Sequence, residues 1–248
     1  MIKTIAAHEL RLLSRSPFAW IAAGLTQLIF SWLFLAALDR FDSVQAELAV
    51  SAPTTGLTAY LVVHFLAPAS IVLMLATPLL CMSLIAGDVA YQRGLWASAP
   101  VSAGEIATGK FLGGLIFQYL LLMVSVVMVC SLAPLTDLDK GHLTIAFAGL
   151  AGFIAMATAL SLLFSSLTRR PPLAAFLSFA VLLLLWLAAA GSAGSFTAAL
   201  SPSTHLNSFM QGLLDSRDAL YFICACAVLL TLTALRINAT CRAPAQAV

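Results

Sequence analysis

Long apolar segments alternate with short polar stretches along the whole chain, and the apolar segments set the expected fold. A helix needs about 20 residues to cross the roughly 30 Å hydrocarbon core of a bilayer. Six segments approach or exceed that length, so the pattern predicts an all-α, polytopic membrane protein with six transmembrane helices. The expected spans cover residues 18–38, 59–85, 111–132, 143–167, 171–190 and 220–235.

The composition agrees with a membrane protein. Only 9% of the residues are charged and 62% are hydrophobic, whereas about a quarter of a typical soluble domain is charged. The connections between spans are too short to fold as soluble domains, so residues 1–248 are expected to form a single transmembrane domain. The first span is too long for the apolar core of a signal peptide, so it is expected to stay in the mature chain. The mild net charge of +2 does not indicate nucleic-acid binding.

The distribution of Lys and Arg predicts the orientation, because cytoplasmic loops collect these residues. If the N-terminus is cytoplasmic, nine such residues fall inside and three fall outside, and most acidic residues also fall outside. Both termini are therefore expected in the cytoplasm. The inner set is Lys3, Arg11, Arg15, Arg93, Lys110, Arg169, Arg170, Arg236 and Arg242, and the outer set is Arg40, Lys140 and Arg217.

Residues 1–16 are expected to form an amphipathic helix that lies in the cytoplasmic interface. Apolar side chains occupy one arc of its helical wheel, and basic side chains, among them Arg11 and Arg15, occupy the other. Glu9 falls at the centre of the apolar arc, where an isolated carboxylate would carry a large desolvation penalty. Two interpretations stay open: Glu9 reaches sideways to water, or it pairs with a basic side chain, for which Arg93 is the hypothesis.

The stretch between the second and third spans contains a motif that invites a wrong interpretation. Residues 104–110 fit the GxxxxGK pattern of a phosphate-binding loop, but Phe111 replaces the Ser or Thr that would bind magnesium. No buried strand precedes the motif, and Ser102 with Glu105 forms an S-x-x-E capping box. The sequence therefore predicts the start of a helix that continues into the third span, and nucleotide binding by this chain is not expected.

A short cytoplasmic helix is expected within residues 87–102. Its polar surface favours a partner, since Trp and Arg are enriched at the energetic centres of interfaces. The alternative is a solvated loop with an interfacial tryptophan. The candidate contact residues are Asp88, Tyr91, Gln92, Arg93 and Trp96.

The predicted spans carry little chemistry of their own, because none contains Asp, Glu, Lys or Arg. His64 is expected to be hydrogen-bonded within the bundle, and Gln27 and Gln118 to hydrogen-bond between helices. An ion-driven carrier generally needs ionisable groups within the membrane, so energy is expected to enter from a cytoplasmic partner. The sequence has no HExxH motif and no CxxC motif, and no nucleophile can be matched to His205, so no catalytic residue and no metal site is predicted.

Small residues and prolines predict how the spans pack. Gly109 with Gly113, and Ala148 with Gly152, provide faces for close helix contact. Prolines within the second span, at positions 68 and 78, are expected to bend it. A bent span would act as a lever on the segment 87–102 that follows it.

Three motifs resemble the type-2 ABC transporter permeases, in particular the subgroup of gliding-motility and nitrous-oxide-reductase-maturation permeases. The first is HELRLLSRSPFAWI at the N-terminus, the second combines an acidic residue, a basic residue and Gly with APVSAGEIATGKF, and the third is SPSTHLNSFMQGLLDSRDALYF. The spacing from Gly94 to Pro100 is about one helical turn shorter than in the family, and Leu95 stands where Thr is common. The matching residues are Glu9, Ser16, Pro17, Asp88, Arg93, Gly94, Ser201, Pro202, His205, Phe209, Gly212, Asp215 and Tyr221.

This resemblance implies a permease subunit of a bacterial inner-membrane exporter that works as a homodimer with two ATPase subunits. The segment 87–102, Gly94 included, would be the coupling helix that docks into the ATPase, and the N-terminal helix with Glu9, Arg11 and Arg15 would support it. ATP and Mg would bind the partner, and this chain would hold no cofactor. The outer loop 191–219 would contain a short helix and the candidate residues His205, Phe209 and Asp215.

One alternative function stays open at this point. The subunit would then transmit mechanical work from the ATPase to an extracytoplasmic accessory protein without moving a substrate. An intramembrane enzyme is the third class considered, and the missing catalytic motifs argue against it.

Overall fold

The computed structural model describes residues 1–51, 56–89, 102–134, 136–188 and 199–242, with the side chains at 45–51, 87–89 and 240–242 left out. Helices dominate these ranges, and no strand occurs within them. The helices are α1 (Ile2–Arg15), α2 (Pro17–Ser51), α3 (Leu57–Leu61), the π-helix η1 (Val62–Leu66), α4 (Ala67–Cys81), α5 (Ser83–Val89), α7 (Ala103–Cys130), α8 (Lys140–Leu167), α9 (Pro171–Leu187), α11 (Pro202–Met210) and α12 (Ser216–Arg242).

Five helical stretches within the described residues are long and apolar enough to cross a membrane. They cover Pro17–Val44, Leu57–Ala86, Ala103–Cys130, Lys140–Leu167 and Ser216–Ala239. The expected sixth span coincides with α9, which has 17 residues and is shorter than the other five. The all-helical fold with several helices able to span a membrane is therefore confirmed, and the sixth span stays a prediction.

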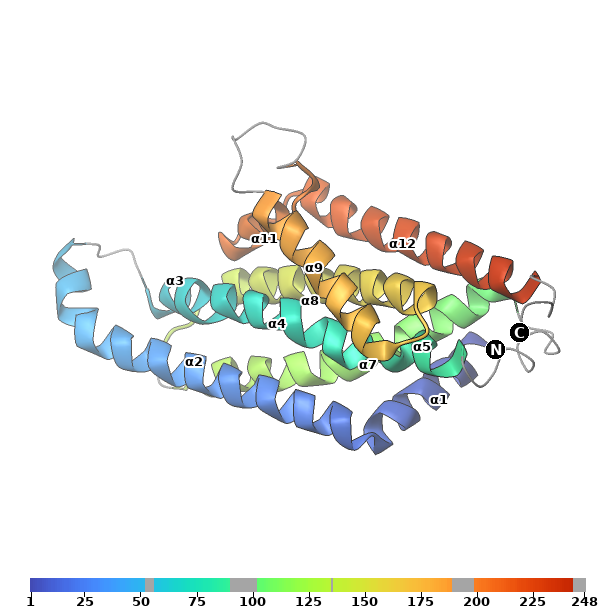
Figure 1. Cartoon of the computed structure of the whole chain (residues 1–248). Coiled ribbons are helices and arrows are strands. Elements are labelled where there is room, and N and C mark those ends of the chain that lie inside the picture. The colour runs from blue at the N-terminus through green and yellow to red at the C-terminus, as the bar shows by residue number, and fades with distance from the viewer. Residues whose placement is uncertain (52–55, 90–101, 135, 189–198, 243–248) are drawn as a thin grey trace.

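The helices form one elongated bundle around α8 (Figure 1). The N-terminus with α1, the end of α12, α5 and the turn between α8 and α9 lie at one end of this bundle, whereas α3 lies toward the other end. α8 supplies much of the core because it contacts α4, α7, α9, α11 and α12. Its side chains Leu150, Phe153 and Ile154 are fully buried. By contrast, α12 lies at the edge of the bundle and exposes much of its apolar surface.

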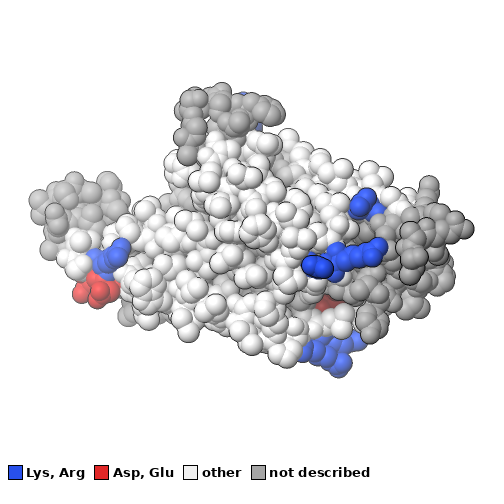
Figure 2. Space-filling model, viewed as in Figure 1, with Lys and Arg blue, Asp and Glu red and all other residues white. Residues whose placement is uncertain are grey.

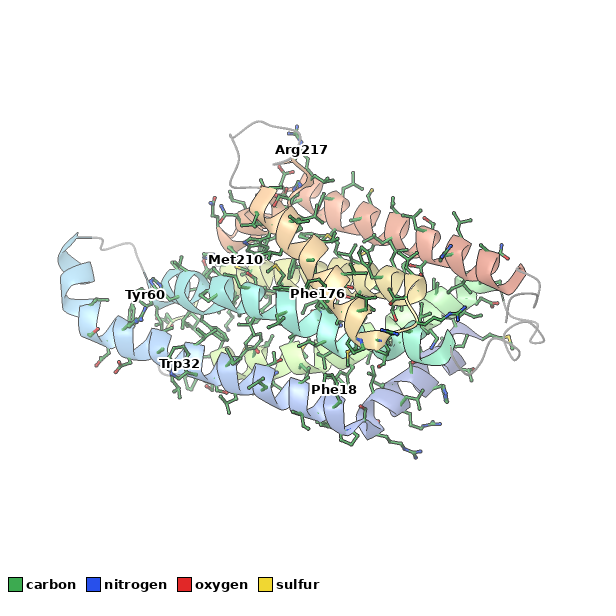
Figure 3. All side chains as sticks on the ribbon, in the orientation of Figure 1. Phe18, Trp32, Tyr60, Phe176, Met210 and Arg217 are labelled. Atoms are coloured by element: carbon green, nitrogen blue, oxygen red, sulfur yellow. The ribbon has the colours of Figure 1, made fainter. Side chains whose placement is uncertain are left out.

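The outer surface of the bundle is apolar between its two ends. On the face drawn in Figure 2, Lys, Arg, Asp and Glu gather toward the ends and leave the middle without charge. Along α2, Ile21, Leu25 and Leu28 recur at helical spacing on the exposed side, and Phe18 and Trp32 continue this side in both directions (Figure 3). A soluble monomer seldom exposes so continuous an apolar surface, so this belt fits contact with lipid.

Two prolines mark irregular points of the second span. Pro68 lacks an N–H and its ring would clash with the carbonyl of residue 64 in a regular helix, and the π-helix η1 occupies this position instead. The N–H of Ala67 accordingly bonds to the carbonyl of Val62, five residues back. Pro78 lies inside α4, and the helix is interrupted four residues later at Met82. The span is therefore irregular at η1 and at Met82, and the bend expected from the prolines stays a prediction.

Candidate functional site

The N-terminal helix packs against the beginning of α7 at two glycines. A Cβ atom placed on Gly109 would lie 2.7 Å from the Cβ of Ile5, and one placed on Gly113 would lie 2.6 Å from the Cβ of Glu9. Only glycine leaves room for the two helices to approach so closely. The predicted close-packing face at Gly109 and Gly113 is therefore confirmed, and its partner is α1.

Glu9 and Lys110 form a buried ion pair between these two helices. Glu9 is 5% exposed and Lys110 is 2% exposed, so both charges lie away from water. The interpretation in which Glu9 reaches water is therefore wrong, because its side chain faces α7. Lys110 is therefore a partner of Glu9 that the sequence did not indicate, and pairing with Arg93 stays a prediction because Arg93 lies outside the described residues.

Arg11 and Arg15 point away from this contact. Both are exposed, whereas Ala6, Glu9 and Leu13 form the buried side of α1. The apolar arc predicted for this helix thus packs on protein, and the basic side chains remain available to solvent or to lipid headgroups.

The capping box at the start of α7 is confirmed. The hydroxyl of Ser102 accepts the backbone N–H of Glu105 at 3.2 Å, and the Glu105 carboxylate accepts the backbone N–H of Ser102 at 3.0 Å. Residues 104–110 are helical from this cap onward. A phosphate-binding loop needs successive backbone N–H groups free to face the phosphates, and a continuous helix uses them internally.

The predicted docking segment is flanked by described helices but lies mainly outside the described residues. Asp88 falls in the last turn of α5, where only the backbone is described, and Tyr91, Gln92, Arg93, Gly94 and Trp96 lie within 90–101. α5 ends immediately before this segment and α7 begins immediately after it. The segment is thus attached to the end of the bundle that carries α1 and the end of α12 (Figure 1).

His205 from the predicted outer loop joins α11 to α12. Its Nδ1 lies 2.6 Å from Oδ1 of Asp218, and its Nε2 lies 2.9 Å from the carbonyl oxygen of Ala199. The ring stacks on Tyr221 with centroids 4.0 Å apart, and the Tyr221 hydroxyl donates to the carbonyl of Leu200 at 2.7 Å. These contacts fasten α11 and residues 199–200 to the first turns of α12.

Asp215 is the candidate carboxylate predicted from the sequence in this region, whereas in the structure Asp218 contacts His205. The Asp215 carboxylate accepts the backbone N–H of Arg217 at 3.0 Å, at the start of α12. Asp218 and Tyr221 are three residues apart and share one face of that helix, which is the signal that could have identified them as a pair. Among the described residues, no hydroxyl or thiol lies within hydrogen-bond distance of the His205 ring, so the ring is not arranged as the base of a nucleophile. The cluster of His205, Asp218 and Tyr221 instead joins two helices and is called the His205 clasp below.

Phe209 and Gly212 position the same region. Phe209 is buried, and its side chain would lie 2.5 Å from a Cβ placed on Gly149 of α8. Gly212 has φ 75°, and hydrogen bonds from Gly212 N–H to Phe209 and from Leu213 N–H to Ser208 end α11 in a Schellman motif. The close-packing face predicted on α8 from Ala148 and Gly152 is confirmed only at Gly152. Gly152 packs against Phe222, whereas Ala148 is exposed.

The polar side chains inside the bundle act between helices, as predicted for the two glutamines. Gln118 donates to the hydroxyl of Thr158 at 2.8 Å and to the sulfur of Cys81 at 3.3 Å, which joins α7 to α8 and α4. Gln27 donates to the carbonyl of Leu121 at 2.6 Å and joins α2 to α7. His64 bonds through Nδ1 to the carbonyl of Tyr60 at 3.1 Å and stacks on that ring. Within the described ranges, no group of three His, Cys, Asp or Glu side chains is arranged to hold a metal ion.

No protein-family model matches this sequence, and no curated protein matches it. The resemblance to type-2 permeases therefore stays a prediction from the three motifs.

Proposed function

We propose that this chain is the membrane-spanning permease subunit of an ABC transporter. It would couple ATP hydrolysis by a separate ATPase to export or translocation across the membrane. The observation that carries this proposal is the arrangement of one end of the bundle, where the buried Glu9–Lys110 pair fixes α1 to α7 beside the two attachment points of segment 90–101. A helix fixed at that place is suited to support a loop on which a partner exerts force.

The interior of the bundle supports an external source of energy. Between residues 18–38, 59–85, 111–132, 143–167, 171–187 and 220–235 the sequence contains no Asp, Glu, Lys or Arg. Apart from His64, the interior polar groups named above are amides, hydroxyls and a thiol, and such groups do not carry protons or ions by changing their charge. ATP and Mg would bind the partner, and this chain would hold no cofactor and catalyse no reaction itself.

The proposed topology includes α9 as a sixth span, with both termini in the cytoplasm of a bacterium and the chain in its inner membrane. A helix of 17 residues is about 25 Å long, close to the thickness of the hydrocarbon core. An even number of spans agrees with α1 and the end of α12 at the same end of the bundle (Figure 1). The excess of Lys and Arg at that end favours the cytoplasm.

Thiol labelling in a variant without native cysteines tests this topology. Arg170 and Leu200 are both exposed and flank α9, and each would be replaced by cysteine in turn. A membrane-impermeant maleimide added to intact cells should label the variant at Leu200 and leave the one at Arg170 unmodified until the cells are opened. Labelling of both positions from outside would contradict a spanning α9.

The proposed assembly contains two copies of the permease and two of the ATPase, by resemblance to the family. The experiment that tests it is gentle purification of the tagged chain from its native membrane, followed by identification of the polypeptides that accompany it. An ABC-type ATPase in equal amount is the expected result. A preparation that stays fully active with no ATPase present would contradict the proposal.

A second candidate function is mechanical transmission to an extracytoplasmic protein. The observation that favours it is an exposed apolar pair, Leu213 and Leu214, between α11 and α12, because these side chains are 59% and 67% exposed beside the His205 clasp. An outer protein in the same purified complex, together with ATP hydrolysis that moves no tested substrate, would favour this function over export.

A further inference from the structure

The hydroxyl of Ser165 in α8 makes all of its hydrogen bonds at the junction between α4 and α5, where the helix is interrupted at Met82. Its hydroxyl accepts the backbone N–H of Ile85 at 3.1 Å and that of Ala86 at 2.9 Å. The same hydroxyl donates to the carbonyl of Met82 at 3.0 Å. A serine hydroxyl has one donor and two acceptor positions, and all three are used by Met82, where the helix is interrupted, and by the first turn of α5.

The other buried hydroxyls in the described part of α8 behave differently. Thr158 and Ser161 each donate to the carbonyl four residues earlier in their own helix. This local bond is the common choice for Ser and Thr within helices, because it satisfies the hydroxyl without a partner on another element. Ser165 is fully buried and bonds to a neighbouring helix instead.

The hydrogen bonds at this junction differ from those of a continuous helix. Pro78 does not account for the difference, because a proline affects the bond to the carbonyl four residues before it, here that of Met74. In a continuous helix the N–H of Ile85 would bond to the carbonyl of Cys81, and here it bonds to Ser165. Insertion of a side chain into the ladder in this way is one of the recognised causes of a change in helix direction.

We propose that Ser165 is a positioning residue whose hydroxyl sets the direction of α5 relative to α4 and ties α5 to α8. α5 leads directly into segment 90–101, and α8 contacts most of the bundle, so a displacement of that segment is passed to the core through this hydroxyl. The claim that Ser165 passes a displacement to the core rests on the proposed ATPase partner. The claim that Ser165 fixes the direction of α5 does not depend on that partner.

Distance measurements between spin-labelled residues test the direction of α5. Genetically encoded labels are placed at Ile71, on an exposed side of α4, and at Val89, the last residue of α5, and a continuous helix would separate their Cα atoms by about 27 Å. Ser165→Ala removes the acceptor for two N–H groups, so we expect the measured distance to shift toward the value for a continuous helix. Ser161→Ala is the matched control, since it removes an equally buried hydroxyl that bonds only within α8. An identical distance in Ser165→Ala and the unmodified chain would overturn the proposal.

ATP hydrolysis of the purified complex tests whether Ser165 passes a displacement to the core. We expect Ser165→Ala to retain the ATPase in the same ratio as the unmodified chain and to lose several-fold of the ATP hydrolysis that depends on the permease, whereas Ser161→Ala retains it. A shifted distance with unchanged hydrolysis would overturn transmission through Ser165. If no ATPase accompanies even the unmodified chain, the proposed function fails, and the distance measurement still decides the role of Ser165 in orienting α5.

Discussion

Replacement of Lys110 by Met should release α1 from the bundle. Lys110 is 2% exposed and its ammonium contacts the Glu9 carboxylate, which is buried as well. Removal of one partner of a buried ion pair costs about 3–5 kcal/mol, because the remaining charge stays out of water without that partner. Met keeps most of the aliphatic volume of Lys, so the effect comes from the charge rather than from a cavity. Amide hydrogen exchange in α1 should accelerate about 100-fold or more, since each 1.4 kcal/mol corresponds to a factor of ten.

The matched control for this variant removes both charges. Glu9→Leu combined with Lys110→Met leaves an apolar contact between α1 and α7, and such replacements of a whole buried pair are often close to neutral. We therefore expect the double variant to protect α1 better than either single variant does. If the effects of the two single substitutions simply add, Glu9 and Lys110 are not energetically coupled and the pair does not hold α1 in place.

Addition of one methyl group at Gly113 should displace α1 by a different physical route. The Cβ atom of an alanine there would lie 2.6 Å from the Cβ of Glu9 and 3.0 Å from the carbonyl oxygen of Ala6. The second neighbour is backbone, so the clash cannot be relieved by rotating a side chain and α1 must move. We expect Gly113→Ala to destabilise the contact by about 1–3 kcal/mol, as overpacking of a tight site does, measured as faster exchange in α1 and a lower melting temperature.

Gly104 provides the control for Gly113 on the same helix. No atom lies within 4 Å of a Cβ placed on Gly104, so Gly104→Ala meets open space. Because alanine favours helix over glycine by about 1 kcal/mol, this variant should be slightly more stable than the unmodified chain. Equal exchange in α1 for Gly104→Ala and Gly113→Ala would show that α1 does not pack on α7 as closely as the structure has it.

The spans and the cap of α7 could be predicted from sequence because their causes are local. Long apolar runs require burial in lipid wherever they fold, and the bonds between Ser102 and Glu105 join residues three apart. The expected span 18–38 lies within α2, which continues to Ser51 because the apolar pattern marks only the part in lipid and a helix can extend beyond it. The apolar test also gave α9 a longer span than the 17 residues of this helix.

The two side-chain pairs could be predicted only in part, because each depends on the tertiary arrangement. The helical wheel showed that Glu9 needs a partner, but Lys110 is 101 residues away and becomes its partner only when α1 folds back along α7. His205 was selected from a motif, and its contact with Asp218 arises because α11 returns against the start of α12. The docking residues around Arg93 remain a prediction, since they lie outside the described ranges.

ATP hydrolysis by the purified assembly in lipid nanodiscs tests the central claim most directly, namely that a separate cytosolic ATPase drives this chain through segment 90–101. The account predicts that hydrolysis belongs to a second polypeptide bound to the chain, that Arg93→Glu abolishes its binding or its coupling, and that the control Arg170→Glu, an exposed residue outside the segment, retains both. Full activity of the chain purified alone, or no effect of Arg93→Glu on an assembled and active complex, would contradict it.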